Sequence, residues 1–431
     1  MEVFSISILL ISFLLLLSIG TPVAWSIIIS SLFTLFVSVP FLPALTTISQ
    51  RMATGIDSFA LLAIPFFILS GELMNSGGVA HRLVAFAKAL VGFLPGGLAL
   101  INIISAMLMG SVAGSAMASA SAMGSILGPE MEKEGYSRGF GVAINITSAT
   151  TGLVIPPSNI LIVYSLASGG ASIAALFLAG YIPGILTGLF LMIVAMLWAK
   201  KKNFKTGKRE PLKKVLNSFV RAFPSLMLLI VVIGGIVSGV FTATEASAIA
   251  VIYTLVLGFF YKEITLKTLP SILLKSSITT AIVMFLIGAS MSMSWVLSYE
   301  NIPEMISNGI LSLSDNKIVI LLLINFTLLF VGIFMDMTPA VLIFTPIFLP
   351  IVTQLGIDPV HFGIIMILNL CIGLCTPPVG SVLFVGVGVA NTSIQKVIKP
   401  LIPLFLAMII ALLLVTYIPA LSLWLPSIFD L

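Results

Sequence analysis

The sequence predicts an all-α, polytopic membrane protein made of two inverted repeats, and three observations support this fold class. First, 59% of its 431 residues are hydrophobic and only 8% are charged, far below the roughly 25% charged residues of soluble domains. Second, uncharged apolar runs recur from one end of the chain to the other. Third, two of these runs are interrupted by the same motif, Gly152-Leu-Val-Ile-Pro156-Pro157 and Gly373-Leu-Cys-Thr-Pro377-Pro378, 221 residues apart.

The apolar runs have the length that a membrane-spanning helix requires. Runs such as 4–19, 22–39, 59–74 and 182–199 approach or reach the ~20 residues needed to cross a lipid bilayer. The Lys and Arg residues lie in short loops between the runs, so the net charge of +5 does not indicate a nucleic-acid partner. In this arrangement the basic residues mark topology.

The positive charges predict which loops face the cytoplasm. The loop 200–214 holds eight Lys and Arg residues, which places it in the cytoplasm by the positive-inside rule. Counting crossings outward from it puts 18 of the 20 Lys and Arg in the cytoplasm, leaving Arg51 and Lys317 outside. This count requires that residues 97–134 and 316–354 each enter and leave the membrane on one side. The sequence therefore predicts two re-entrant hairpins.

The resulting plan has about five transmembrane helices and one hairpin per half, with both termini periplasmic. Because each half crosses the membrane an odd number of times, the second half starts on the opposite side of the membrane and is inverted relative to the first. Residues 79–90 and 301–313 are expected to be interfacial arms that precede the hairpins. The predicted units are a first repeat at 1–199 (hairpin about 97–134, broken helix about 139–168), a cytoplasmic linker at 200–216, and a second repeat at 217–431 (hairpin about 316–354, broken helix about 362–390).

The Pro-Pro motifs predict unwound backbone inside the membrane. Proline lacks an N–H and clashes with the preceding helical turn, and such breaks survive in hydrocarbon only where they are buried in protein or line a cavity. A break exposes carbonyls that suit Na⁺ and N–H groups that suit a carboxylate. Ser158 and Asn159 follow the first break, where capping of a restarted helix would also explain them. Ser111 and Ser115 flank the expected tip of the first hairpin, within a stretch of small residues that otherwise suits helix packing.

The second hairpin turns at Met335-Asp336-Met337-Thr338-Pro339. Asp336 is the one acidic residue expected deep in the membrane at a tip, where an ionisable group is costly and is a functional hypothesis by default. It would ligate a cation, balance charge, or cap the next helix. Glu72 and Glu245 lie nearer the ends of spans and are expected to form structural pairs. The two cysteines, Cys371 and Cys375, are expected to serve helix packing.

These residues occur in a chain that resembles, from end to end, the large membrane subunit of tripartite ATP-independent periplasmic (TRAP) transporters, the DctM-type family. The resemblance rests on Gly20-Thr-Pro-Val-Ala, GSVAGSAMASASAMGS, GLVIPPSN, Phe241-Thr-Ala-Thr-Glu-Ala and GLCTPPVGSVLF. It implies an elevator-type fold like that of the ion-transporter superfamily, in the bacterial inner membrane. It also implies Na⁺-coupled uptake of an organic anion. The implied partners are a separate small four-helix membrane subunit and a soluble periplasmic binding protein.

The resemblance also implies roles for individual residues. One Na⁺ site would comprise Ser111, Ser115, Thr151, Gly152 and Pro156. A second Na⁺ site would comprise Asp336, Thr338, Gly373 and Thr376. The substrate would lie between the hairpin tips, near Ser115, Ser158, Asn159, Asp336 and Gly380.

Other functions remain open at this point. A cation- or proton-coupled organic-anion carrier or antiporter that works without a binding protein would use Asp336 as its proton-carrying acid. An intramembrane enzyme is disfavoured, because the sequence has no HExxH motif and its two histidines, His81 and His361, lie near expected membrane edges. A channel is opposed by the paired breaks. The sequence does not choose between sialic acid, a C4-dicarboxylate and other small organic acids.

Overall fold

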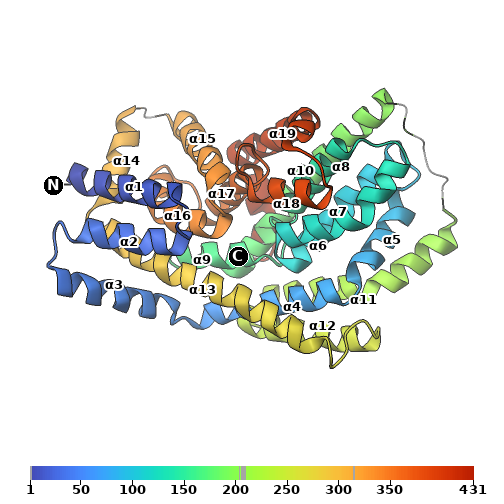
Figure 1. Cartoon of the computed structure of the whole chain (residues 1–431), viewed down its shortest axis with the longest axis horizontal. Coiled ribbons are helices and arrows are strands. Elements are labelled where there is room, and N and C mark those ends of the chain that lie inside the picture. The colour runs from blue at the N-terminus through green and yellow to red at the C-terminus, as the bar shows by residue number, and fades with distance from the viewer. Residues whose placement is uncertain (1, 203, 205–209, 314–315) are drawn as a thin grey trace.

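The computed structural model describes residues 2–202, 204, 210–313 and 316–431, and these residues form helices and connecting loops without strands (Figure 1). The first half contains α1 (Glu2–Ser18), α2 (Val23–Leu35), α3 (Phe41–Ile56), η1 (Phe59–Leu62), α4 (Ala63–Ser76), α5 (Val79–Val91), α6 (Gly97–Ala113), α7 (Ala116–Lys133), α8 (Arg138–Thr151), α9 (Asn159–Ala167) and α10 (Ile173–Lys201). The second half contains α11 (Leu212–Val237), α12 (Ala243–Phe260), α13 (Leu269–Tyr299), α14 (Ile302–Leu313), α15 (Lys317–Phe334), α16 (Met337–Gln354), α17 (Pro359–Gly373), α18 (Ser381–Val389), α19 (Ile394–Tyr417) and α20 (Ala420–Ile428).

The helices confirm the prediction of an all-α, polytopic membrane protein. Within the described residues, eight helices are long and apolar enough to span a membrane. They are η1 with α4, and α10, α11, α12, α13, α15, α16 and α19. By length and composition α15 and α16 would each span a bilayer, so their assignment to a re-entrant hairpin stays a prediction.

Two helices, α3 and α20, were not predicted from the sequence. Residues 41–56 contain Gln50, Arg51 and several Thr residues, and they lack the apolar run of a span. Helix α3 contacts α13 through a cation–π interaction, in which the Arg51 guanidinium lies 4.9 Å from the centre of the Trp295 ring. Helix α20 is only nine residues long, which is too short to register as a span.

The predicted linker 200–216 joins the two halves. Helix α10 ends at Lys201 and α11 begins at Leu212, so both ends of this segment are helical. Residues 203 and 205–209 lie outside the described part of the chain. The assignment of the linker to the cytoplasm stays a prediction.

The two halves contact each other in reciprocal pairs of helices. Helix α6 packs on α8 in the first half, and α15 packs on α17 in the second. Across the halves, α9 packs on α16 while α18 packs on α7, and α8 packs on α19 while α17 packs on α10. A two-fold relation between the halves requires this kind of exchange. The boundaries of the two repeats nevertheless remain predictions.

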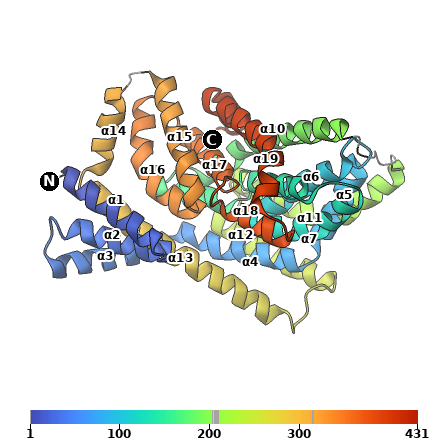
Figure 2. The same cartoon turned by 45° about the horizontal axis from the view of Figure 1, so that its top comes forward.

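A layer of long helices lies along one side of these interlocked elements (Figures 1 and 2). Helix α13 packs against α2, α3, α4 and α16, and α4 packs against α12 and α6. Hairpins α6–α7 and α15–α16 lie on the other side together with the broken helices α8–α9 and α17–α18. The layer of α4 and α13 therefore faces the hairpins.

Each hairpin meets its broken helix through a contact between two glycines. A Cβ added to Gly152 would lie 2.9 Å from the Cα of Gly110, and one added to Gly373 would lie 2.5 Å from the Cα of Gly332. Non-bonded carbon atoms prefer ≈ 3.5–4.0 Å, so neither position has space for a side chain. Helices α6 and α15 therefore cross α8 and α17 backbone to backbone, just before the breaks.

The two breaks also hold each other. The Cys371 thiol donates to the Thr150 carbonyl over 3.0 Å, and the Cys375 sulfur lies 3.3 Å from the Thr150 hydroxyl. Both cysteines are buried and unbridged, which confirms their predicted role in packing. Tyr164 of α9 donates to the carbonyl of Pro359 at the start of α17, over 2.6 Å. These contacts join the two broken helices into one unit.

The glycine contact makes a testable prediction for stability. We expect Gly373→Ala to lower the free energy of unfolding by about 2 kcal/mol, because the added methyl forces α15 away from α17. Gly388→Ala is the matched control, because nothing lies within 4 Å of its Cβ position on α18. Thermal unfolding in detergent measures both. Equal melting temperatures for the two variants would contradict the close crossing.

Candidate functional site

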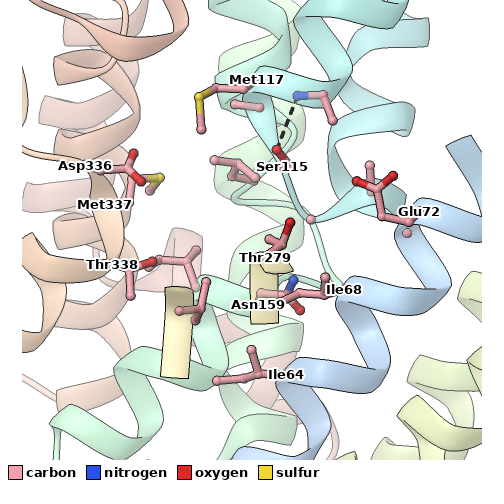
Figure 3. A pocket seen from close by; sticks show the side chains of 18 of the residues that line it. Ile64, Ile68, Glu72, Ser115, Met117, Asn159, Thr279, Asp336, Met337 and Thr338 are labelled. Carbon is pink, nitrogen blue, oxygen red and sulfur yellow. Dashed lines mark hydrogen bonds between the residues drawn. The ribbon is translucent and has the colours of Figure 1, made fainter. Parts of the chain in front are cut away.

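A cavity of about 400 Å³ lies between the two hairpin tips and the layer formed by α4 and α13 (Figure 3). In this view Asp336 and Thr338 line one side, Ser115 and Asn159 lie near the middle, and Glu72 lies on the α4 side. The wall contains residues from both hairpins, both broken helices, α4 and α13. It therefore joins elements that are far apart in the sequence.

The first hairpin turns sharply at Gly114, whose φ of +60° is a left-handed conformation that favours glycine. A Cβ here would also lie 2.7 Å from the side-chain amide of Asn159. Ser115 follows as the N-cap of α7, and its hydroxyl accepts a hydrogen bond from Ala118 N over 3.2 Å. The small residues at this tip thus let Asn159 of the broken helix pack directly against it.

The second hairpin places Asp336 at the position that Ser115 occupies in the first, 221 residues later. Asp336 is the N-cap of α16, but its side chain makes no capping hydrogen bond. It is exposed on the wall of the cavity. The Gly380 N–H donates to the Ile333 carbonyl over 3.1 Å, which ties the second break to this tip. The second break is therefore hydrogen-bonded to the hairpin whose tip carries the Asp336 carboxylate.

Four helices begin at the cavity. Its wall contains residues from the first turns of α7, α9, α16 and α18. A helix N-terminus carries a partial positive charge of roughly +0.5 and unpaired N–H groups. Together these ends make the cavity attractive to an anion.

The charged side chains of the wall include more acidic than basic residues, in contrast to the partial positive charge of the helix ends. They comprise two carboxylates, Glu72 and Asp336, and one ammonium, Lys275. Lys275 Nζ lies 2.8 Å from Glu72 Oε2, and this pair leaves Asp336 as the uncompensated charge. The cavity therefore combines helix ends that suit an anion with a carboxylate that suits a cation.

The structure divides the predicted site residues into two groups. Ser115, Asn159, Asp336 and Thr338 line the cavity. The remaining predicted residues do not line it: Ser111, Thr151, Gly152, Pro156, Ser158, Gly373, Thr376 and Gly380. The second group lies at the glycine crossings and in the breaks. Ser111, for example, follows Gly110, which contacts Gly152.

The hydroxyls at the crossings remain able to ligate a cation. Ser111, Thr151 and Thr376 each donate to a carbonyl three or four residues earlier, over 2.9, 2.8 and 2.7 Å. A hydroxyl that donates its hydrogen still has lone pairs to offer. Ser158 and Ser381 have buried hydroxyl oxygens with no hydrogen-bond partner among the described residues. Buried polar groups are normally paired, so these oxygens fit a bound ion or polar ligand.

Several residues of the wall were missed from the sequence. They are Asn75, Lys275 and Thr279. Ser381 at the second break was also missed, although it does not line the cavity. Ser381 had no equivalent signal, since Ser158 directly follows Pro157 whereas Val379 and Gly380 separate Ser381 from Pro378. Glu245 forms the expected structural pair as a capping box with Thr242. Glu72 forms one as well, although it also lines the cavity.

A comparison with known protein families identifies the family of this chain. The model for the DctM component of tripartite ATP-independent periplasmic transporters matches residues 10–421. This chain belongs to that family. It is therefore a multi-pass membrane permease subunit.

Known proteins resemble this DctM chain over most of its length. The uncharacterized protein YgiK of Salmonella typhimurium is 56% identical, covering 99% of this chain and 98% of YgiK. The C4-dicarboxylate TRAP transporter large permease protein DctM of Pseudomonas aeruginosa is 40% identical (86% and 87%). The sialic acid TRAP transporter large permease protein SiaM of Vibrio cholerae is 38% identical (96% of each).

A solved transporter has the same general fold. The crystal structure of the YdaH transporter of Alcanivorax borkumensis superposes with a TM-score of 0.63, covering 90% of each chain at 14% identity. At this identity the likeness concerns the fold alone.

The N-cap at the first tip makes a second prediction. Ser115→Ala should lower the free energy of unfolding of this DctM chain by about 1 kcal/mol, because α7 loses its capping hydrogen bond. Ser172→Ala is the matched control, since Ser172 caps α10 in the same way through Ala175 N over 3.3 Å and does not line the cavity. Thermal unfolding should give similar losses. A much larger loss for Ser115→Ala would show that the tip does more than cap its helix.

Proposed function

We propose that this chain is the large permease subunit of a Na⁺-coupled importer that takes up a small organic anion delivered by a periplasmic binding protein. One observation carries the proposal: four helix N-termini from both hairpins and both breaks converge on a cavity that also exposes Asp336. That combination offers sites of both signs within one cavity.

The anion is held by the helix ends and by polar side chains. Backbone N–H groups at the starts of α7, α9, α16 and α18 satisfy carboxylate oxygens. Asn159 adds an amide near the middle of the cavity and Thr338 a hydroxyl on the side that carries Asp336. Since these groups come from both halves, the anion would bridge the two hairpin tips.

The cation offsets the charge that the anion adds. The wall has a formal charge of −1 from Glu72, Asp336 and Lys275, so a carboxylate that enters alone would meet repulsion from the Asp336 carboxylate. Na⁺ prefers the oxygen ligands found here, namely the Asp336 carboxylate, the hydroxyls at the crossings and the carbonyls of the breaks. Binding of Na⁺ would therefore precede or accompany binding of the anion.

Transport would occur by an elevator movement. The glycine crossings, the Thr150–Cys371 contact and the Gly380–Ile333 hydrogen bond join hairpins and breaks into one body. Helices α4 and α13 face this body across the cavity. The joined body would carry anion and Na⁺ past a fixed scaffold that includes α4 and α13.

The relatives indicate the class of substrate and the partners. The names of two relatives specify sialic acid and C4-dicarboxylates, so a small organic acid is the proposed cargo. Because the family is tripartite, the proposed partners are a small membrane subunit and a periplasmic binding protein. Both termini would lie in the periplasm, as the positive-inside count predicts.

Asp336→Asn tests the proposal directly. In proteoliposomes that contain this chain with its small subunit, and with the binding protein added, a Na⁺ gradient should drive uptake of labelled sialic acid or succinate. We expect Asp336→Asn to reduce uptake about thirtyfold, because a charge-assisted contact of ~2 kcal/mol is lost. Glu304→Gln is the control, since Glu304 is an exposed acid on α14 outside the cavity.

Two results would contradict the proposal. Normal uptake by Asp336→Asn with an unchanged Na⁺ requirement would remove Asp336 from the cation site. Uptake by the unaltered protein on a proton gradient, without Na⁺ or binding protein, would favour the carrier that uses Asp336 as a proton-carrying acid.

A further inference from the structure

An ion pair lies on the scaffold side of the cavity, opposite the hairpin tips. Lys275 of α13 and Glu72 of α4 are joined over 2.8 Å, and both line the cavity. Lys275 is the seventh residue of α13, about 9 Å along the helix from its start at 1.5 Å per residue. The pair therefore lies inside the helical layer rather than in a loop.

The burial of the pair argues against a purely structural role. The Lys275 side chain is 61% exposed and that of Glu72 is 16% exposed. An ion pair with one partner this exposed contributes little to stability. Ionisable residues within membrane-spanning helices are costly and usually serve function. Because both side chains also face the cavity, the pair has access to whatever the cavity binds.

We propose that Lys275 contacts the carboxylate of the transported anion and that Glu72 competes with the anion for Lys275. The proposal rests on the proposed function and extends it to a residue that determines affinity. Among the residues that line the cavity, Lys275 is the one positively charged side chain. A carboxylate that enters the cavity therefore finds one ammonium, and that ammonium already has a carboxylate partner.

The competition sets how tightly the anion is held. When the anion contacts Lys275, one carboxylate replaces another, so the ammonium keeps its charge partner throughout. When the anion leaves, Glu72 pairs with Lys275 again and favours release. A lone lysine would hold the anion more strongly and slow its release. Glu72 thus limits affinity in a carrier that must both bind and discharge its cargo.

The surroundings position the pair to meet cargo held at the tips. Gly71, the neighbour of Glu72, packs against the first hairpin, since a Cβ there would lie 2.7 Å from the Ala113 carbonyl oxygen. Thr279 lies one turn beyond Lys275, lines the same cavity, and donates to the Lys275 carbonyl over 3.0 Å. The ion pair is therefore adjacent to the place where the first tip meets α4.

Neutral substitutions distinguish this role from a structural ion pair. Equilibrium binding of labelled sialic acid and labelled succinate is measured on the purified complex of this chain with its small subunit, in Na⁺ and in K⁺. We expect Lys275→Gln to raise Kd about tenfold, since the anion loses a charge-assisted contact. Glu72→Gln should lower Kd severalfold, because Lys275 loses its competitor. The double variant should bind as weakly as Lys275→Gln.

A structural pair predicts a different pattern. Both single variants would then weaken binding and lower the melting temperature together, and the double variant would recover. Single variants that change Kd in the same direction, or not at all, would therefore overturn the role of Lys275. Lys275→Arg, which retains the positive charge, should restore most of the affinity.

Matched controls lie outside the cavity. Lys267→Gln removes a lysine just before α13, and Glu263→Gln removes an acid that pairs with Arg82 over 3.8 Å. Neither should change Kd. If the unaltered complex binds neither probe in a Na⁺-dependent manner, the proposed function fails and this inference fails with it. If it binds and the variants do not diverge, only the inference fails.

Discussion

The site depends on two backbone crossings, Gly110 on Gly152 and Gly332 on Gly373. A Cβ would lie less than 3.0 Å from backbone atoms at Gly110, Gly152 and Gly373, and 3.1 Å from one at Gly332, so side chains here would push a hairpin away from its break. The crossings fix where each hairpin tip lies relative to the restarted helix beyond the break. They therefore bring the starts of α7, α9, α16 and α18 to one cavity. Small residues serve here to set the geometry of a site as well as to pack helices.

The sequence predicted the elements that carry a local signal. Pro156-Pro157 and Pro377-Pro378 indicated the breaks, and Asp336 stood out as an acid at an expected tip. Helix α3 was missed because its polar residues make its sequence resemble that of a loop. The charge count used Lys275 only as a topology marker, and the structure adds that it belongs to α13 and lines the cavity. Proximity of that kind depends on tertiary packing between distant segments, and no periodicity or motif reports it.

The electrostatics of the cavity support the proposal that an anion and a cation bind together. Helix ends attract an anion, yet the formal charges of Glu72, Asp336 and Lys275 on the wall sum to −1. Neither an anion nor a cation alone balances both features. The ion pair between Lys275 of α13 and Glu72 of α4 also matters, because it supplies a positive charge that already has a carboxylate partner. Affinity is then set by competition among carboxylates, and this suits a carrier that must release what it binds.

Thiol labelling at the cavity tests most directly that anion and Na⁺ share it. Met117 is exposed on the wall and is not among the proposed ligands, while the two native cysteines are buried, so Met117→Cys provides one reactive thiol. Its rate of modification by a small maleimide is measured with sialic acid or succinate, in Na⁺ and in K⁺. The account predicts that one of these anions slows labelling in Na⁺ and not in K⁺. Labelling that is unchanged in Na⁺, or slowed equally in K⁺, would contradict it.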